Sequence, residues 1–273
     1  RKEMKCFMDQ LITSRENPVI KQTAALIKST KERKQKKLFV CQGAKVLRQA
    51  TNNGVKLVRL LLTPVQVEKE KELYNYCVQM AIPVNYISPE LAQKISDEKT
   101  PQGVFGICEG LDKADELAII VANGKYIAVE NLQDPGNLGT IIRTAVAFGI
   151  DGVIIAGESV DIYSPKVLRS TMGALFSCPL HFSQCLPETL RQLHAKGIKS
   201  YGAVLQPEAK QLGSFTFPPG SVVVIGNEGR GLSKETICAC SDTLFIPMKS
   251  GAIDSLNASI AAAAIMWEMC RPL

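Results

Sequence analysis

The chain alternates short apolar runs with segments in which apolar residues recur every three to four positions. The short runs predict strands buried in a sheet, and the helical spacing predicts helices that cover it. In the first 110 residues the predicted strands are 38–41, 55–63, 84–87 and 104–108. The predicted helices there are 17–30, 44–51, 67–80 and 89–95. Such alternation predicts a small α/β sandwich with a parallel or mixed sheet.

The same alternation resumes after a composition change at residues 110–124, where 117–122 is predicted as a short helical turn. We therefore expect a domain boundary at about residue 112, giving domains 1–112 and 113–273. The predicted strands of the second domain are 126–129, 152–156, 200–205, 222–226 and 243–247. The stretch that begins at Gln133 is predicted to open a helix running to about Phe148, and a last helix is predicted over 255–270. Continuous apolar strands between helices predict a doubly wound parallel sheet.

Length and composition place the chain among soluble globular proteins. Its 273 residues suffice for two domains, and 46% are hydrophobic. No apolar run reaches the roughly 18 residues that cross a bilayer, and no long apolar stretch follows the charged N-terminus. The nine cysteines are scattered singly, which is typical of reduced thiols. We therefore expect a cytoplasmic protein.

Metal chemistry is not expected from the residue inventory. The only two histidines, His181 and His194, have no partner at metal-ligand spacing, and only Cys238 and Cys240 lie close together. A histidine-based triad is disfavoured for the same reason. Surface or core positions are the better interpretation of both histidines.

Positive charge is concentrated in the first domain. Residues 1–110 hold 19 Lys and Arg against 11 Asp and Glu, a net charge of +8, whereas the remainder has a net charge of −2. This asymmetry predicts that the first domain meets a polyanion. The densest run supplies the candidate contacts Lys31, Arg33, Lys34 and Lys36. The alternative interpretation of this run is a solvated helix end.

Three segments of the second domain carry unusual local chemistry. In the first, Gln133 to Ala145, a proline and two glycines predict a tight turn that opens a helix, with Arg143 inside that helix. The second, Val222 to Leu232, places Gly226, Gly229 and Gly231 at a strand end. The third joins residues 244–248 to Ser255–Ser259. Strand-end turns that bring backbone close to a flat ligand would have this pattern.

A dinucleotide site is the first alternative for the glycines. Their spacing, Gly226-x-x-Gly229-x-Gly231, differs from the dinucleotide fingerprint, and no βαβ unit with a closing acidic residue follows. Ordinary turns and core packing are the second alternative, and they apply most to Ile246 and Leu256.

Together and in this order, the three segments resemble the motifs of the SpoU (TrmH-like) RNA ribose methyltransferases of the SPOUT superfamily. Residues 12–21, 38–43 and 100–104 resemble that family's N-terminal substrate-binding domain. Gln42 departs from the family's usual acidic residue, and Thr171 from its commoner serine. The resemblance implies an L30e-like first domain and a SPOUT α/β knot, in which the chain from about Gly226 to the last helix threads a loop. It also implies a homodimer formed through the C-terminal domain.

The resemblance further implies S-adenosylmethionine as methyl donor, with no metal. The implied donor contacts are Gly226, Ile246, Leu256, Met248 and Leu205. The candidates on the acceptor side are Arg143, Asn137, Glu228, Ser255 and Asn257. A guanidinium grips phosphate bidentately but abstracts protons poorly, so we expect Arg143 to position the acceptor and stabilise charge. Ser255 serves equally well as the N-cap of the last helix.

The leading hypothesis is therefore an S-adenosylmethionine-dependent RNA 2′-O-methyltransferase acting on ribosomal RNA. RNA is favoured because DNA lacks the 2′-hydroxyl. Transfer RNA is the nearest alternative substrate. A ribosome-assembly factor that binds RNA without catalysis is the alternative of a different class, and failure to bind the methyl donor would favour it.

Overall fold

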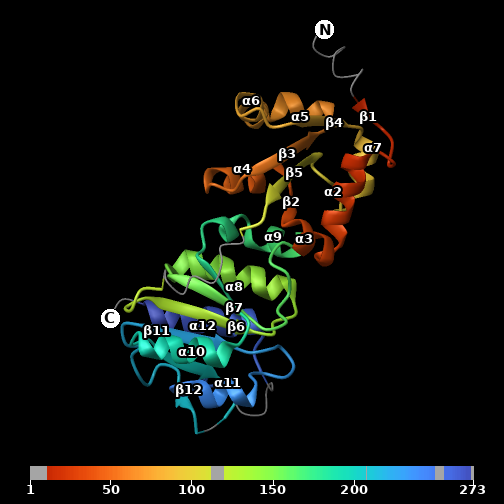
Figure 1. The fold of residues 1–273 in the computed structure, drawn as a ribbon. Helices are drawn as coiled ribbons and strands as arrows, with labels where there is room; N and C mark the ends of the chain where they lie inside the picture. The colour runs from red at the N-terminus through yellow and green to blue at the C-terminus, as the bar shows by residue number, and fades with distance from the viewer. Residues whose placement is uncertain (1–10, 112–119, 207, 250–254, 272–273) are drawn as a thin grey trace. The chain divides into compact units, whose positions relative to one another are not determined.

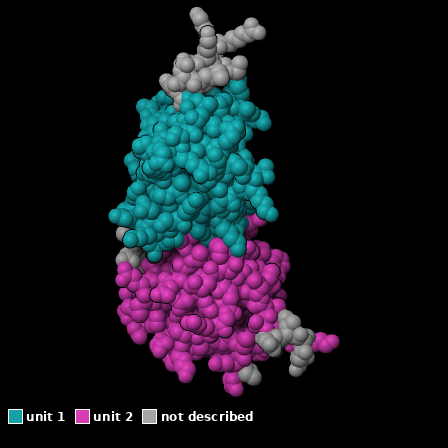
Figure 2. Space-filling view, turned by 90° about the vertical axis from the view of Figure 1, so that its right-hand side faces the viewer, with its two compact units in different colours: residues 1–112, 163–176 teal, residues 113–162, 177–273 magenta. Residues whose placement is uncertain are grey.

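The computed structural model describes residues 11–111, 120–206, 208–249 and 255–271 (Figure 1). The chain forms two compact units (Figure 2). Unit 1 contains residues 1–112 and 163–176, and unit 2 contains residues 113–162 and 177–273. Residues 117–119 of the helical turn predicted at 117–122 lie outside the described residues.

Unit 1 is built on a mixed five-stranded sheet with the order β1-β4-β3-β5-β2. Its strands are β1 (Leu11–Ile12), β2 (Leu38–Gln42), β3 (Leu57–Leu62), β4 (Val84–Ile87) and β5 (Val104–Glu109). Its helices include α2 (Pro18–Lys28), α3 (Thr30–Lys36), α4 (Ala44–Asn52), α5 (Pro64–Lys69), α6 (Lys71–Gln79) and α7 (Pro89–Ile95). Strand β5 runs antiparallel to both β2 and β3, while β1, β4 and β3 are parallel. The α/β sandwich with a mixed sheet is thus confirmed.

Local sequence explains where these helices begin and end. Asn17 and Ser88 cap α2 and α7 through their side-chain oxygens, and a proline follows each cap. The single helix predicted over 67–80 is wrong, because the chain breaks at Glu70 into α5 and α6. The Glu70 carboxylate pairs with Arg48 of α4 at this break.

Residues 163–176 belong to unit 1 although they lie far along the chain. They form α9 (Pro165–Thr171) and the short 3₁₀ helix η2 (Ala174–Phe176). Tyr163 stacks on Phe39 with ring centroids 4.5 Å apart, and Arg169 pairs with Asp97 at 2.7 Å. A single boundary near residue 112 therefore does not describe how the chain divides.

Unit 2 contains a parallel seven-stranded sheet with the order β10-β12-β9-β11-β6-β7-β8. Its strands are β6 (Lys125–Glu130), β7 (Gly152–Ala156), β8 (Leu180–Ser183), β9 (Lys199–Ala203), β10 (Lys210–Gln211), β11 (Ser221–Ile225) and β12 (Asp242–Phe245). Its helices are α8 (Pro135–Phe148), α10 (Leu186–Ala195), α11 (Lys234–Ala239) and α12 (Ala258–Cys270). Since β11 is inserted between β9 and β6, the direction of strand order reverses beside β6.

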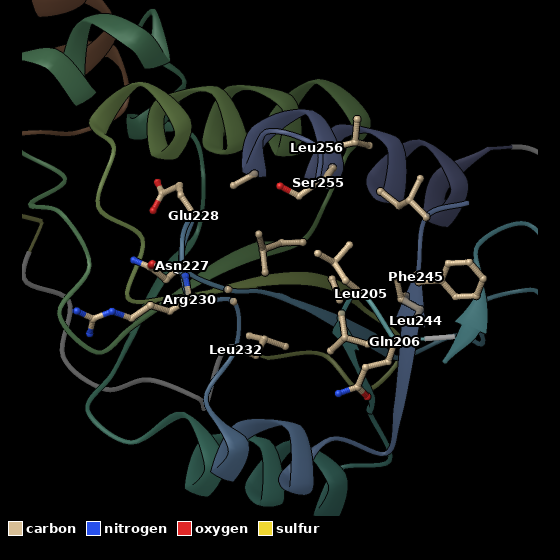
Figure 3. A pocket seen from close by; sticks show the side chains of 18 of the residues that line it. Leu205, Gln206, Asn227, Glu228, Arg230, Leu232, Leu244, Phe245, Ser255 and Leu256 are labelled. Carbon is tan, nitrogen blue, oxygen red and sulfur yellow. Dashed lines mark hydrogen bonds between the residues drawn. The ribbon is translucent and has the colours of Figure 1, made fainter. Parts of the chain in front are cut away.

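Helices cover both faces of this sheet, as continuous apolar strands require. Helices α8 and α12 pack together on one face, and α10 and α11 lie on the other (Figure 3). Leu186, Leu190 and Leu193 of α10 pack on the buried strands. The parallel sheet covered by helices is therefore confirmed, and no helix of the described residues is both long and apolar enough to cross a membrane.

Candidate functional site

The largest concentration of predicted functional residues lies at the carboxyl ends of β9, β11, β6 and β12. Open parallel sheets bind ligands at this edge, where the strand order reverses. A cavity of about 540 Å³ opens there, within the size range of small-molecule sites (Figure 3). All five residues predicted to contact the donor line it, namely Gly226, Ile246, Leu256, Met248 and Leu205.

The wall contributed by β11 needs glycine at Gly226. A Cβ placed there would lie 2.3 Å from the carbonyl carbon of Gly231 and 2.5 Å from the amide nitrogen of Leu232. The loop that follows turns back on itself, so Asn227 and Gly231 exchange backbone hydrogen bonds of 3.0 and 2.9 Å. Gly231 has a φ of +69°, which favours glycine. Gly226 therefore serves close backbone packing, whereas Gly231 serves the conformation of the turn.

The opposite side of the cavity is apolar. Leu205, Leu244, Ile246, Met248 and Leu256 contribute side chains to it. Leu205 is 65% exposed, so a ligand in the cavity would cover it. A pocket with apolar side chains on one wall and glycine-rich backbone on the other fits a flat nucleoside-like ligand such as S-adenosylmethionine.

A polar network joins all three motifs beside the cavity. The Glu228 carboxylate accepts hydrogen bonds from the backbone N–H of Gln133 and Asp134, at 3.1 and 2.9 Å, and from Asn137 Nδ2, at 3.0 Å. Asn137 Oδ1 in turn accepts from Asn257 Nδ2 at 2.9 Å. Glu228 thus holds the start of α8, as a carboxylate does best near a helix N-terminus.

Asn257, not Ser255, caps α12. Asn257 Oδ1 accepts from the backbone N–H of Ser259 and Ile260, so the helix begins at Ala258. The predicted start at residue 255 and the capping alternative for Ser255 are therefore wrong. Ser255 is exposed and lines the cavity, which leaves its hydroxyl facing any bound ligand.

Arg143 lies apart from this network. It is exposed on α8 and does not line the cavity. Within the described residues its guanidinium makes no hydrogen bond or ion pair, and it does not contact Glu228. The residues Thr140 and Ala147, which lie on the same side of α8 as Arg143, are also exposed. The structure therefore leaves this cation available to a molecule outside the chain.

Glu228 has a perturbed acidity that follows from its contacts. Burial alone raises its pKa, but the hydrogen bonds from Asn137, Asp134 and Gln133 outweigh burial and hold the pKa below its usual range. An ionised carboxylate that already accepts these bonds is a poor general base. Its role is therefore to hold the motifs together.

This acidity predicts a pH-dependent contribution to stability. Because the folded pKa lies below the ordinary value of 4.5, the contribution is present above that value and is lost as pH falls through the folded pKa. We expect Glu228→Gln to be less stable than wild type at pH 7, by less than about 1 kcal/mol because solvent screens the side chain. Urea denaturation should show the two free energies of unfolding converging as the pH falls below 4.5. A constant difference would contradict this origin.

The structure adds two site residues that sequence reasoning missed. Glu130, at the end of β6, is buried and accepts hydrogen bonds from Ser233 N and Ser233 Oγ at 2.8 and 2.9 Å. Asn131 follows with a φ of +54°, and its carbonyl accepts from Asn227 Nδ2 at 2.8 Å. A carboxylate ending an apolar strand is the signal that could have revealed Glu130.

The four candidate RNA contacts of unit 1 have different surroundings. Lys31, Lys34 and Lys36 are exposed on α3, and Lys36 pairs with Glu32. Arg33 is only 4% exposed, and its Nη1 donates to the carbonyls of Leu26 and Ile27, at 2.7 and 3.0 Å. The prediction of Arg33 as a surface contact is therefore corrected, because this side chain caps the last turn of α2. Among the described residues, no group of three or more His, Cys, Asp or Glu could hold a metal ion.

Comparison with known proteins agrees with this architecture. Residues 124–267 match the model of the SpoU rRNA Methylase family, and residues 17–106 match the MRM3-like substrate binding domain. The chain is 32% identical to a 23S rRNA (uridine(2479)-2′-O)-methyltransferase of Streptomyces viridochromogenes, covering 95% of this chain and 91% of the relative. It is 29% identical to the 23S rRNA (guanosine(2553)-2′-O)-methyltransferase RlmP of Bacillus subtilis, covering 88% and 91%. An AdoMet-bound rRNA methyltransferase from Sinorhizobium meliloti superposes with a TM-score of 0.84 at 29% identity, covering 95% and 96%.

Proposed function

Because the chain belongs to the SpoU rRNA methylase family, we propose that it transfers a methyl group from S-adenosylmethionine to a ribose 2′-hydroxyl of ribosomal RNA. The observation that carries this proposal is the cavity. Residues of the second segment (Val222 to Leu232) and of the third (244–248 and 255–259) line it, and Glu228 joins the first segment (Gln133 to Ala145) to it by hydrogen bonds. The relatives named above support ribosomal RNA over transfer RNA.

Different residues of the chain would bind the donor and hold the loops around it. Gly226, Ile246, Leu256, Met248 and Leu205 would enclose the donor, whose sulfonium supplies an electrophilic methyl group when bound. Because that methyl group is activated already, we propose a reaction without a metal ion. Asn137, Glu228 and Asn257 fix the motif loops, and Ser255 faces the cavity. Holding the two reactants in near-attack geometry can supply several kcal/mol.

Arg143 would bind the acceptor nucleotide on the outer side of α8. Its guanidinium suits a phosphate, and its positive charge stabilises the oxygen as the proton leaves. Arginine itself is not the base, since a guanidinium donates hydrogen bonds and has no acceptor for a proton. Glu228 is committed to its three donors, so a phosphate oxygen or solvent takes the proton.

The test of the proposed function is direct. The protein is incubated with labelled S-adenosylmethionine and unmethylated ribosomal RNA, and the RNA is digested and searched for 2′-O-methyl nucleosides. Methylation of transfer RNA alone would favour the alternative substrate. Calorimetry with S-adenosylmethionine addresses the assembly factor, because failure to bind the donor would support a non-catalytic role.

Unit 1 is proposed as the RNA-binding domain. Residues 1–110 carry a net charge of +8, and Lys31 and Lys34 of α3 are exposed without an ion pair among the described residues. The match of residues 17–106 to a substrate binding domain supports this assignment, and the family resemblance supports its L30e-like fold.

This assignment predicts a salt dependence. Reversing Lys31, Lys34 and Lys36 to Glu should lower the slope of log affinity against log salt by about two, because each neutralised phosphate releases counterions. Filter binding with an rRNA fragment at salt concentrations between about 50 and 200 mM measures this slope. Reversing Lys45, Lys69 and Lys94, which are exposed on other helices, changes net charge equally and is the matched control. Equal slopes for the two triple variants would remove α3 from the RNA site.

We also propose a homodimer formed by the exposed face of α8 and α12. Apart from Ser259 and Glu268, the side chains of helix α12 are apolar, and Ile260 and Trp267 remain 56% and 57% exposed. Trp267 contacts Phe148 of α8, with ring centroids 5.9 Å apart, and Val146 is also exposed. Such a patch is typical of an interface. Since Arg143 lies on the exposed side of α8, a dimer through this face would bring it near the partner.

We also propose a cytoplasmic location and a knotted topology for the chain. The eight described cysteines are free thiols, in keeping with a cytoplasmic location. The family resemblance supports a knot in which the chain from about Gly226 to α12 threads a loop of unit 2.

A further inference from the structure

The loop between Asn227 and Gly231 is held at several points. Asn227 Oδ1 accepts hydrogen bonds of 3.0 Å from the backbone N–H of both Gly229 and Arg230. Asn227 Nδ2 donates to the carbonyl of Asn131 at 2.8 Å. The paired backbone of Asn227 and Gly231 closes the loop, and Glu228 anchors it to α8. The backbone that carries Arg230 is therefore fixed before any ligand arrives.

The side chain of Arg230 contrasts with this fixed backbone. It is exposed at the edge of the cavity, and among the described residues its guanidinium has no hydrogen bond or ion pair. Figure 3 shows it extending away from Leu205 and Leu244 of the apolar wall. Residues 111–273 carry a net charge of −2, in contrast to the +8 of residues 1–110.

An unpaired guanidinium on a rigid loop fits an anion supplied from outside. Two oxyanions enter this reaction, the carboxylate of the donor and the phosphates that flank the acceptor ribose. Enclosing the donor is the role of the apolar wall, and Arg230 extends away from that wall. A guanidinium binds a phosphate through two parallel hydrogen bonds, which fixes orientation as well as position.

We propose that Arg230 binds an RNA phosphate next to the ribose to be methylated and so positions the acceptor. This inference rests on the proposed function and adds a residue to it. Arg143 and Arg230 would then hold the acceptor from two motifs, α8 and the loop after β11. Loss of Arg230 should weaken acceptor binding and leave the donor pocket intact.

The test compares Arg230→Ala with wild type in steady-state methylation of an rRNA fragment. The KM for RNA should rise about 10- to 100-fold, the scale of a lost charge-assisted hydrogen bond, while kcat at saturating RNA changes less than about threefold. Affinity for S-adenosylmethionine, measured by calorimetry, should stay within about twofold. The salt slope of RNA binding should fall by about one. Arg230→Lys should recover the salt slope and only part of the KM, because an ammonium lacks the planar fork.

Arg191→Ala is the matched control, because Arg191 is an exposed arginine of unit 2 that pairs with Glu188 and does not line the cavity. A large loss of donor affinity in Arg230→Ala, with unchanged RNA affinity, would assign the side chain to the donor carboxylate and overturn the proposal. Equal KM and equal RNA affinity for Arg230→Ala and wild type would overturn it too. An inactive wild-type protein that binds no donor would instead refute the proposed function, so the two failures are distinguishable.

Discussion

Replacing Arg143 with alanine should reduce methyl transfer by about a thousandfold, the scale of losing a preorganised group that stabilises charge in a transition state. The guanidinium is exposed and makes no hydrogen bond or ion pair among the described residues, so its removal breaks no contact that stabilises the fold. It also does not line the cavity. Single-turnover methylation of rRNA measures the rate, and calorimetry measures donor affinity.

Two further variants sharpen this test. Arg143→Lys should recover little activity, because a point charge does not reproduce a bidentate fork. Arg191→Ala should retain wild-type activity as the exposed arginine control. Weakened donor binding in Arg143→Ala would assign Arg143 to the donor site and refute its role on the acceptor.

The second large effect should follow from charging the exposed face of α8 and α12. Trp267→Glu and Ile260→Glu together would place two carboxylates in an apolar patch. If that patch is the interface, like charges face each other across a two-fold axis, and the protein becomes monomeric. We expect sedimentation at micromolar concentration to shift to the 29.7 kDa chain mass, with loss of most methylation activity.

The stability of the isolated subunit separates interface loss from unfolding. Both positions are more than half exposed, so the double variant should keep its far-UV circular dichroism spectrum and its donor affinity. Val65→Glu, at a similarly exposed apolar position in unit 1, is the control that should leave the oligomer unchanged. A wild-type protein that sediments as an active monomer would rule the dimer out.

The sequence placed the proposed donor contacts close together for a physical reason. Parallel strands end at one edge of a sheet. The residues that follow β9, β11 and β12 therefore meet at that edge, independently of the conformation of the loops that connect the strands. Leu205, Gly226 and Ile246 are such residues, and they line one cavity. Apolar runs locate buried strands, and strand order then brings their ends together.

Side-chain direction was harder to predict. Arg33 belongs to a lysine-rich run, but Ser29 ends α2 and also caps α3, so the chain turns at that residue. That turn brings Arg33 to the open carbonyls of α2. At the start of α12, Ser255 and Asn257 are both good capping residues, and only tertiary contacts choose between them. Asn257 is chosen because its amide also reaches Asn137.

The boundaries of helices and of the two units also depend on contacts between residues that are distant in sequence. The break between α5 and α6 coincides with the ion pair of Glu70 with Arg48, and no local helix breaker marks it. The placement of residues 163–176 in unit 1 depends on Tyr163 and Arg169 meeting partners from the first 100 residues. Periodicity within a window of the chain carries no information about such pairs.

The hydrogen bonds that join the motifs also bear on how the protein folds. Glu228 and Asn137 are 91 residues apart, Ser233 and Glu130 are 103 apart, and Asn257 and Asn137 are 120 apart. Each hydrogen bond requires closure of a long loop. The loop loses conformational entropy before the hydrogen bond contributes any stabilising free energy. Strands β6 and β7 can pair early, whereas this network waits for β11 and α12. We therefore expect competence to bind the donor to arise late in folding, after this network has formed.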